Sequence, residues 1–406
     1  MIIFDASSLK TKKHWVDAGE KIFDAPTVFI PYSREGLEFL YFRWLDRMGL
    51  PDPADGIVPY FRLIVRARGK LEVGWLSCMQ CHSRVMPDGS VIRGAQGNFP
   101  NVALGFGSEV EKARQSNRFL FTTPWMDPDP VDIVETMDLD EIYDLHAAIP
   151  PGVIARHRTS PFNPVQVPDL IGVEDRKYLD RTGLQQHGGI VDMMRYAVLN
   201  TGGDNLASFG GFIPMGLNTP DGKVPAPDSG PNAPARWSDE QLYALGLYIY
   251  SLQPPKNPNA FDETAARGKK VFNDEGCGGC HAPPLYTNNK LTPAEGFDVP
   301  AKHREKYDIL DVSVGTDPGL AMDTRRGTGY YKVPSLKGVW YRGPFGHDGS
   351  AQTLEDWFDP ARLADDYVPT GFIGYGVENR AIRGHEFGLR LSPEKKAALI
   401  GFLKTL

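Results

Sequence analysis

Two short motifs contain every cysteine in the chain. Both read Cys-x-x-Cys-His, and their residues are Cys78, Cys81 and His82 in the first and Cys277, Cys280 and His281 in the second. At this spacing two thiols can form thioethers with the two vinyl groups of one haem, while the adjacent imidazole reaches the iron. The motifs therefore predict two covalently bound c-type haems, with His82 and His281 as proximal ligands.

Three other uses of these cysteines are open on the sequence alone. Four thiols can hold a zinc ion, a Cys-x-x-Cys pair can be a redox dithiol, and two disulfides would also use all four. A zinc site or disulfides leave both histidines without a role, so haem attachment explains more of each motif. Covalent haem is attached outside the cytoplasm, which predicts a periplasmic or secreted protein.

The composition is that of a folded, acidic protein. The chain has 406 residues, 41% of them hydrophobic, and a formal net charge of −7. This charge argues against a nucleic-acid partner, since domains that bind nucleic acid are usually basic. No apolar run is long enough for a transmembrane helix. The N-terminus lacks the basic and apolar regions of a signal peptide, so we interpret the sequence as a mature form.

Similarity between the two halves predicts two related domains. The paired segments are 167–173 with 333–339, 238–252 with 392–406, and 19–23 with 268–272. A linker rich in proline and asparagine, 254–259, separates an N-terminal domain (1–253) from a C-terminal domain (260–406). We expect a mainly α fold of two cytochrome c-like haem domains with long loops. The first domain is longer than the second because it contains insertions. These insertions either surround a substrate or are solvent-exposed additions without a role in the chemistry.

Segments 238–252 and 392–406 are predicted to be the helices that close each domain. Ser238 stands at an N-cap position with Gln241 three residues later, as in a capping box. Ser392 is followed by Pro393 at the first helical position. Apolar side chains recur at helical spacing in both segments, at Leu242, Leu245, Ile249 and Leu252, and at Leu399, Phe402, Leu403 and Leu406.

The sixth position of each iron decides its chemistry, because a six-coordinate haem usually transfers electrons whereas an open haem can bind peroxide or oxygen. In the second domain the candidate ligands are His303, Met322, His347 and His385. We favour His385, since it lies between Gly384 and Gly388, and glycine lets the backbone approach a flat cofactor closely. His347, followed by an Asp-Gly turn, is expected to be structural or to lie beside a propionate.

The first domain offers no equivalent ligand loop. His187 takes the place in the repeat that His347 holds in the second domain, which favours a structural role. We therefore expect the first haem to be the reactive one, with an open or weakly blocked distal face. Phe209 and Phe212 precede the closing helix and are the candidates for lining that distal pocket. Ordinary core packing is the alternative for both.

The stretch 333–350, the following Thr353-Leu-Glu-Asp and the last residues 399–406 resemble bacterial di-haem cytochrome c peroxidases. That superfamily includes the enzyme that matures methylamine dehydrogenase. The resemblance is strong over 260–406 and weak over 1–160. It implies that peroxide or oxygen reacts at the N-terminal haem, while the C-terminal haem relays electrons from a small donor, a cytochrome or cupredoxin. It also implies a calcium ion between the domains, with Asn163 matching the family's asparagine ligand.

The chain departs from this family in two places. The family's relay haem takes methionine or tyrosine from the loop before the last helix, where this chain has His385. A bis-histidine haem has a lower potential than a His/Met haem. The family's reactive pocket uses a glutamate, and 200–215 contains none. His385 and the sequence that begins at Trp340 (Trp-Tyr-Arg-Gly-Pro) are more similar to the corresponding features of di-haem rubber oxygenases.

Three functions fit these residues. The first is a di-haem oxidoreductase that reacts with peroxide or oxygen at the N-terminal haem. The second is a di-haem dioxygenase that cleaves an organic substrate. The third is an electron-transfer di-haem cytochrome without substrate chemistry. A zinc-binding interaction module is the alternative in which no haem is bound.

Overall fold

The computed structural model describes residues 4–26, 28–31, 62–75, 77–99, 136–155, 161–200, 237–324 and 327–406. These parts belong to two compact units. The first unit takes its residues from 1–100, 167–174 and 236–255, and the second from 101–166, 175–235 and 256–406.

The passage between the units at 255–256 falls inside the predicted linker. The described residues of 136–166 and 175–200, however, group with the second unit and not with the rest of 1–253. Hydrogen bonds explain this grouping. The backbone N–H of Gln166 donates to His347 O at 2.8 Å, and the Tyr178 hydroxyl bonds Asp308 at 3.2 Å.

The first unit places the first haem motif on a short helix. Its elements are η1 (Ala6–Ser8), α1 (Lys12–Asp24), β1 (Val28–Pro31), β2 (Arg62–Ala67), β3 (Lys70–Trp75), α4 (Cys78–Cys81), β4 (Ser83–Val85), β5 (Val91–Arg93) and α9 (Asp239–Ser251). Strands β1, β3 and β2 form an antiparallel sheet in that order, and β4 pairs with β5. The hydroxyl of Ser77 caps α4 by accepting from the Gln80 N–H, so the motif occupies one capped helical turn.

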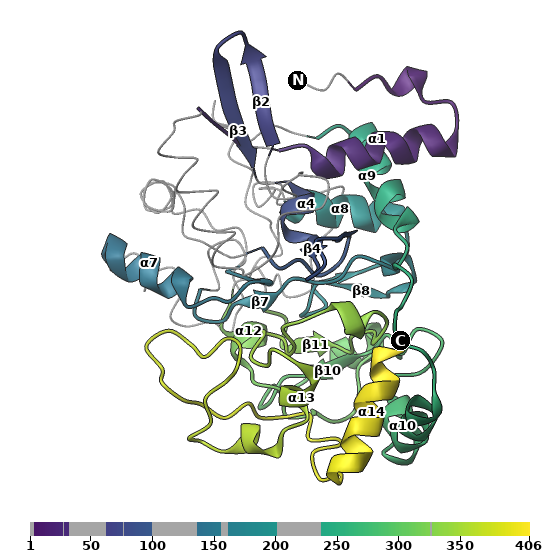
Figure 1. Ribbon diagram of the computed structural model, residues 1–406, viewed down its shortest axis with the longest axis vertical. Helices are drawn as coiled ribbons and strands as arrows, with labels where there is room; N and C mark the ends of the chain where they lie inside the picture. Colours follow the sequence, from purple (N-terminus) through teal and green to yellow (C-terminus); the bar gives the residue numbers. More distant parts are fainter. Residues whose placement is uncertain are drawn as a thin grey trace. The chain divides into compact units, whose positions relative to one another are not determined.

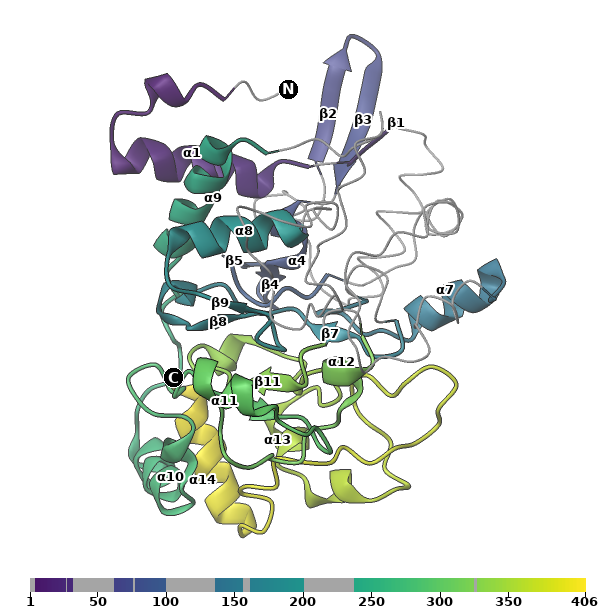
Figure 2. The ribbon, with the colours of Figure 1, turned by 180° about the vertical axis from the view of Figure 1, so that it is seen from behind.

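Helices α1 and α9 lie side by side in the first unit (Figures 1 and 2). Gly19 of α1 stands at their closest approach, because a Cβ there would overlap the carbonyl group of Ala244 and crowd the Cβ of Tyr248. The predicted capping box of Ser238 and Gln241 is confirmed. The predicted apolar stripe of α9 is also confirmed, since its leucines and Ile249 are buried.

The second unit contains the second haem motif and the remaining elements. They are α7 (Leu139–Ala147), β6 (Val153–Ile154), β7 (Val165–Gln166), β8 (Tyr178–Leu179), β9 (Gln185–Gln186), α8 (Ile190–Asn200), α10 (Glu263–Asp274), η6 (Cys277–Gly279), β10 (Leu291–Pro293), α11 (Ala301–Lys306), α12 (Gly319–Met322), β11 (Tyr330–Lys332), η7 (Val339–Tyr341), α13 (Leu354–Trp357), η8 (Pro360–Leu363) and α14 (Pro393–Lys404). One more short helix, η4 (Val173–Asp175), lies where the chain passes from the first unit to the second. The strands form two-stranded antiparallel pairs, β6 with β7, β8 with β9 and β10 with β11.

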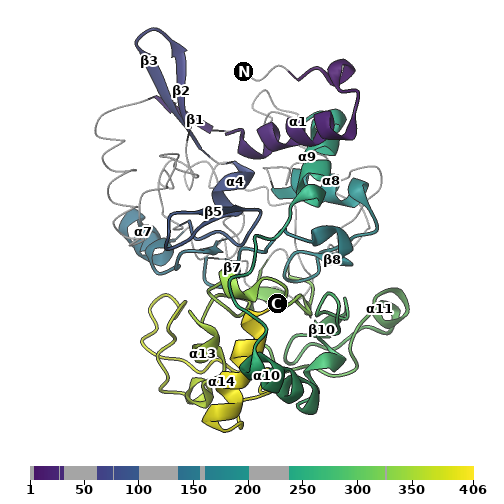
Figure 3. The same cartoon turned by 45° about the vertical axis from the view of Figure 1, so that its right-hand side comes forward.

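Helices α10 and α14 repeat the packing of α1 and α9 (Figure 3). Gly268 of α10 stands at the crossing, because a Cβ there would overlap the carbonyl group of Ala398 and crowd the Cβ of Phe402. The prediction for Ser392 and Pro393 is confirmed, since the serine hydroxyl caps α14 and the proline is its first residue. Equivalent glycines at equivalent crossings confirm the internal repeat.

Helices and long irregular segments make up most of the described structure, and the strands are short. This is compatible with the mainly α class. Within the described ranges, none of the helices combines the length and the apolar character needed to cross a membrane.

Candidate haem-binding sites

The histidine of each motif has one ring nitrogen bonded to a backbone carbonyl. His82 Nδ1 lies 3.0 Å from Pro168 O, and His281 Nδ1 lies 3.1 Å from Tyr286 O. A carbonyl only accepts hydrogen bonds, so each Nδ1 carries the hydrogen. The lone pair of the ring is then on Nε2, where a metal ion can bind. Proteins commonly orient metal-binding histidines in this way.

Burial keeps both imidazoles neutral. It lowers the pKa of His82 to about 4, against a smaller opposite effect of the hydrogen bond to Pro168. Burial also lowers the pKa of His281. The neutral ring is the form that binds a metal, so both side chains are ready to ligate at neutral pH.

The repeated pairs Val167-Pro168 and Val333-Pro334 place backbone carbonyls beside the motif histidines. Pro168 supplies the carbonyl that bonds His82, and the equivalent Pro334 supplies a second carbonyl facing His281. In the first unit, the Leu170 N–H also donates to Gly94 O at 2.8 Å, which ties this segment to the haem motif. Each repeated segment therefore orients the histidine of its own motif.

The cysteines lie in surroundings that suit thioethers better than thiolates. None of the four cysteines is paired with another in a disulfide. Burial raises the pKa of Cys78 to about 12 and that of Cys81 to about 11. It also raises the pKa of Cys277 and Cys280. Burial thus disfavours the thiolate form on which a redox dithiol depends.

Cys277 packs against an apolar cluster that a porphyrin edge can join. The buried members of this cluster are Phe272, Val339, Leu354, Phe358, Leu399, Ile400, Phe402 and Leu403. Among the residues that the structure describes, no three His, Cys, Asp or Glu side chains are grouped to hold a metal ion without a porphyrin. The two thiols and the imidazole at each motif thus fit a haem.

His385 faces the proximal histidine of the second motif. The ring centres of His281 and His385 are 6.2 Å apart, and their planes make an angle of 64°. An imidazole nitrogen binds a metal at about 2.0–2.1 Å and the ring centre lies about 1.1 Å behind it, so two histidines on one ion place their ring centres roughly 6.3 Å apart. The observed separation leaves room for one iron between the rings.

The backbone around His385 is built for this position. His385 has a φ of 48° and Gly384 a φ of 81°, both in the left-handed region. The His385 N–H donates to Val314 O at 2.7 Å, and a Cβ on Gly384 would overlap the carbonyl of Gly315. Nδ1 of His385 is buried and has no hydrogen-bond partner among the residues that the structure describes. An unsatisfied buried imidazole with a strained backbone is typical of a functional position.

The other candidate ligands of the second domain have different surroundings. His303 Nδ1 lies 2.9 Å from the Tyr330 hydroxyl, and His347 Nε2 lies 3.7 Å from Asp317. Met322 packs against the apolar cluster of β7 and α12. His187 Nδ1 lies 2.7 Å from Arg176 O, in agreement with the structural role expected for it.

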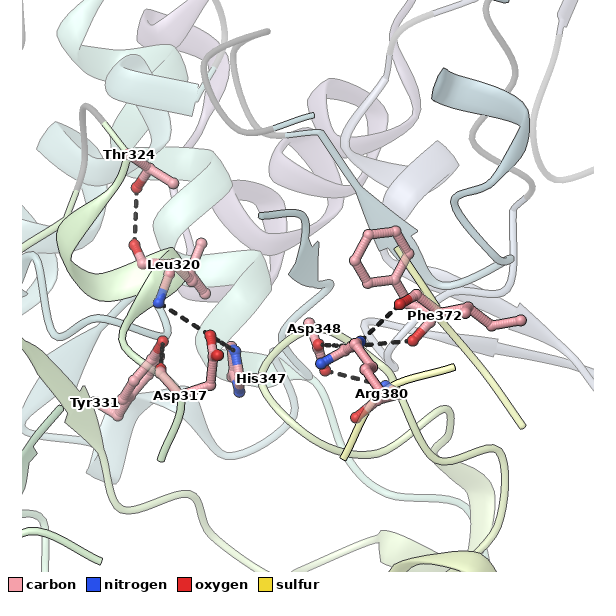
Figure 4. Close-up of polar contacts among 11 residues, drawn as sticks. Asp317, Leu320, Thr324, Tyr331, His347, Asp348, Phe372 and Arg380 are labelled. Atoms are coloured by element: carbon pink, nitrogen blue, oxygen red, sulfur yellow. Dashed lines mark hydrogen bonds and ion pairs between the residues drawn. The ribbon is translucent and has the colours of Figure 1, made fainter. Parts of the chain in front are cut away.

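His347 belongs to a polar group that joins two loops of the second unit (Figure 4). Its ring packs on Tyr331, with 4.8 Å between ring centres. The Tyr331 hydroxyl donates to Asp317 O at 2.7 Å. The neighbouring Asp348 accepts from Arg380 Nη2 at 2.5 Å, and Arg380 also donates to two backbone carbonyls. These contacts give the His-Asp-Gly sequence a structural role, which was one of the two roles expected.

Replacing Asp348 with asparagine should destabilise the second unit by about 3 kcal/mol at pH 7, because it breaks a buried ion pair and leaves the Arg380 charge uncompensated. Burial opposes ionisation of Asp348, but the charges of His347 and Arg380 hold its pKa below the usual value. A lowered carboxyl pKa contributes stability that is present above about pH 4, the unfolded value, and is lost as the pH falls through the folded pKa. Urea unfolding at several pH values measures this.

The matched control is Asp365→Asn, which breaks the exposed pair with Arg383. The side chains of that pair are 85% and 67% exposed, so little change is expected. Equal losses for the two variants, or a loss for Asp348→Asn that stays constant down to pH 3, would contradict the role assigned to Asp348.

Two groups of predicted residues are not joined to a site. Phe209 and Phe212 lie outside the described residues, so the open distal face of the first haem stays a prediction. Asn163 is described, and its side-chain oxygen lies against Gly319, beside the carboxylate of Asp317. The calcium ion predicted at Asn163 likewise stays a prediction.

Sequence reasoning missed two residues behind His385. The Trp357 ring centre lies 5.7 Å from that of His385, and the guanidinium carbon of Arg362 lies 4.7 Å from the Trp357 ring centre. No spacing rule joins these residues to the ligand loop. The Thr353 side chain caps α13 in front of Trp357, a helix signal that the sequence carried.

Comparison with known proteins gives only distant similarities. No family model and no curated protein matches the chain. Among solved structures, the hydrazine synthase of Kuenenia stuttgartiensis is 17% identical, with 74% of this chain and 88% of that chain covered and a TM-score of 0.34. A MauG-like protein associated with microbial copper homeostasis is 16% identical, with 73% and 88% covered and a TM-score of 0.36. Scores this low establish neither a shared fold nor a shared function.

Proposed function

We propose that this chain is a periplasmic di-haem c-type oxidoreductase. Cys78, Cys81 and His82 would hold a haem for reaction with peroxide or oxygen, and Cys277, Cys280, His281 and His385 would hold a second haem for electron relay. The single observation that carries the proposal is the asymmetry between the two motifs. His281 faces a second histidine at iron-spanning distance, whereas the sequence provides no ligand loop for the iron at His82.

The histidines of the two sites have different roles in this proposal. The Nδ1 atoms of His82 and His281 are held by carbonyls, so Nε2 of each ring would be the nitrogen that holds a haem. Such a hydrogen bond raises the basicity of the ligating nitrogen. When bound, haem supplies one-electron chemistry at its iron. His385 would be a second protein ligand at the second site, which favours electron transfer over binding of a small molecule.

A small donor protein, a cytochrome or cupredoxin, supplies the electrons in this proposal. The periplasmic location follows from covalent haem attachment. An organic-substrate dioxygenase and a purely electron-transferring cytochrome are the alternatives, and the experiment below separates the last of them from the proposal.

The test is electron paramagnetic resonance and optical spectra of the holoprotein, oxidised and half-reduced, before and after peroxide. The native protein should show one low-spin bis-histidine haem and one haem that binds peroxide or oxygen in at least one redox state. His385→Ala should convert the low-spin signal of the second haem to high spin. His385→Met should keep it six-coordinate with a higher potential, since His/Met ligation raises the potential.

His303→Ala is the matched control, because His303 is a histidine of the same unit whose Nδ1 bonds a tyrosine hydroxyl. It should leave both haem spectra unchanged. Two low-spin haems in every redox state, with no reaction toward peroxide or oxygen, would contradict the proposal and favour the electron-transfer cytochrome. An unchanged second haem in His385→Ala would remove His385 as its ligand.

A further inference from the structure

Arg362 is a fully buried arginine beside the His385 loop. It lies on η8 and is 0% exposed. The donors of its guanidinium reach only backbone carbonyls among the bonds that the structure records. Nε donates to Trp357 O and Nη2 donates to both Gly384 O and His385 O, each at 2.9 Å. Nη1 donates to Ile382 O.

These bonds hold the loop, which also contacts Val314 and Gly315. The Ile382 N–H returns a hydrogen bond to Arg362 O at 2.6 Å, so η8 and the loop are joined in both directions. The left-handed backbone at His385 is unfavourable for a residue with a side chain. Arg362 stabilises it, because Nη2 of its rigid guanidinium bonds two consecutive carbonyls of the strained segment, Gly384 O and His385 O.

Arg362 also brings a positive charge close to the ligand. Among the described residues, the carboxylate whose charge acts on Arg362 is that of Glu386, which is exposed. Nη2 of Arg362 lies 2.9 Å from His385 O, which places the guanidinium charge beside the backbone of the ligand residue. A buried charge is poorly screened. At an iron that alternates between two oxidation states, a nearby positive charge favours the reduced one.

We infer that Arg362 positions His385 toward the iron of the second haem and, through its buried charge, raises the reduction potential of that haem. Arg362 does not touch the iron, so it is a positioning residue. The inference rests on the proposed function, because it requires a haem between His281 and His385. It also accounts for how a relay with two histidine ligands, whose potential is inherently low, accepts electrons from a donor protein.

The test compares Arg362→Gln and Arg362→Lys by potentiometric titration of the holoprotein, with the low-spin signal followed by electron paramagnetic resonance. Both variants lose the carbonyl-binding fork, so the low-spin share of the second haem should fall in both. Only Arg362→Gln loses the charge. Its remaining low-spin haem should have an equilibrium constant for reduction at least tenfold lower, or 59 mV for one electron, with a much smaller shift in Arg362→Lys.

Arg383→Gln is the matched control, because it removes the same charge from the same loop at a side chain that is 67% exposed. Its second haem should keep the native potential. The first haem in each sample is the internal reference for folding. If one Arg362 variant folds poorly, the low-spin share of the second haem in the other variant still tests whether Arg362 positions His385.

An unchanged low-spin share in the Arg362 variants would overturn the positioning role. Equal potentials in Arg362→Gln and Arg362→Lys, or equal shifts in Arg362→Gln and Arg383→Gln, would overturn the electrostatic role. Failure of the proposed function is distinguishable, because it appears in the native protein and in His385→Ala. If the second haem of the native protein lacks bis-histidine ligation, the proposed ligand pair His281 and His385 is wrong, whatever the Arg362 variants show.

Discussion

Replacing Cys277 and Cys280 with alanine is expected to leave the protein with one covalent haem in place of two. In the proposed function, thioethers at these positions would be the covalent links to the second haem, since every cysteine of the chain belongs to one of the two motifs. The pyridine haemochrome assay under denaturing conditions measures the number of attached haems per chain. The remaining spectrum should be that of the reactive haem, without the low-spin component assigned to His281 and His385.

The matched variant is Cys78→Ala with Cys81→Ala, which should remove the other haem and keep the low-spin component. The four-fold variant should bind no covalent haem. If the native protein contains zinc and no haemochrome, the zinc-binding alternative is correct. A native haem content that does not change in either double variant would disprove covalent attachment at these motifs.

Replacing Gly268 with valine should destabilise the second unit by about 3 kcal/mol or more, because the new side chain meets backbone and not a flexible side chain. A Cβ at this position overlaps the Ala398 carbonyl at the crossing of α10 and α14. The helices must then separate, which opens the cluster against which Cys277 packs. Chemical unfolding of the protein followed by circular dichroism measures the loss, and haem incorporation should fall with it.

Gly401 provides the control for this crossing. It lies on α14, where a Cβ would have only an ordinary contact of 3.4 Å with the methyl group of Thr264. Gly401→Ala should be neutral or stabilise the helix by up to about 1 kcal/mol, since alanine has the higher helix propensity. Gly19→Val should act on the first unit as Gly268→Val acts on the second. Tolerance of Gly19→Val and Gly268→Val, with stabilities near the native value, would contradict the tight crossing.

Local features of the chain were predictable because a few neighbouring residues determine them. The caps at Ser238 and Ser392 formed as expected, since a capping side chain bonds a backbone N–H only two or three positions later. The glycines at 19 and 268 were visible as a repeated pattern. That they mark helix crossings required the helices that pack on them, at Ala244 and Ala398.

The grouping of the middle of the chain was not predictable in the same way. Segments around Gln166 and Tyr178 precede the linker, so sequence order assigns them to the N-terminal domain. Their hydrogen bonds to His347 and Asp308 join them to the second unit. Such pairings between distant segments depend on the whole fold, and no local composition or spacing encodes them.

The sequence by itself determined where two haems can attach, because attachment needs only two thiols and an imidazole at a spacing set by one turn of backbone. It also narrowed the sixth ligand of the second haem to a few residues. Only the tertiary structure brought His385 opposite His281, supplied the carbonyls of Pro168 and Tyr286 that orient the proximal rings, and buried Arg362 behind the ligand loop. The physical reason is that ligation needs two side chains on opposite sides of one iron, and packing of segments far apart in the chain decides that placement.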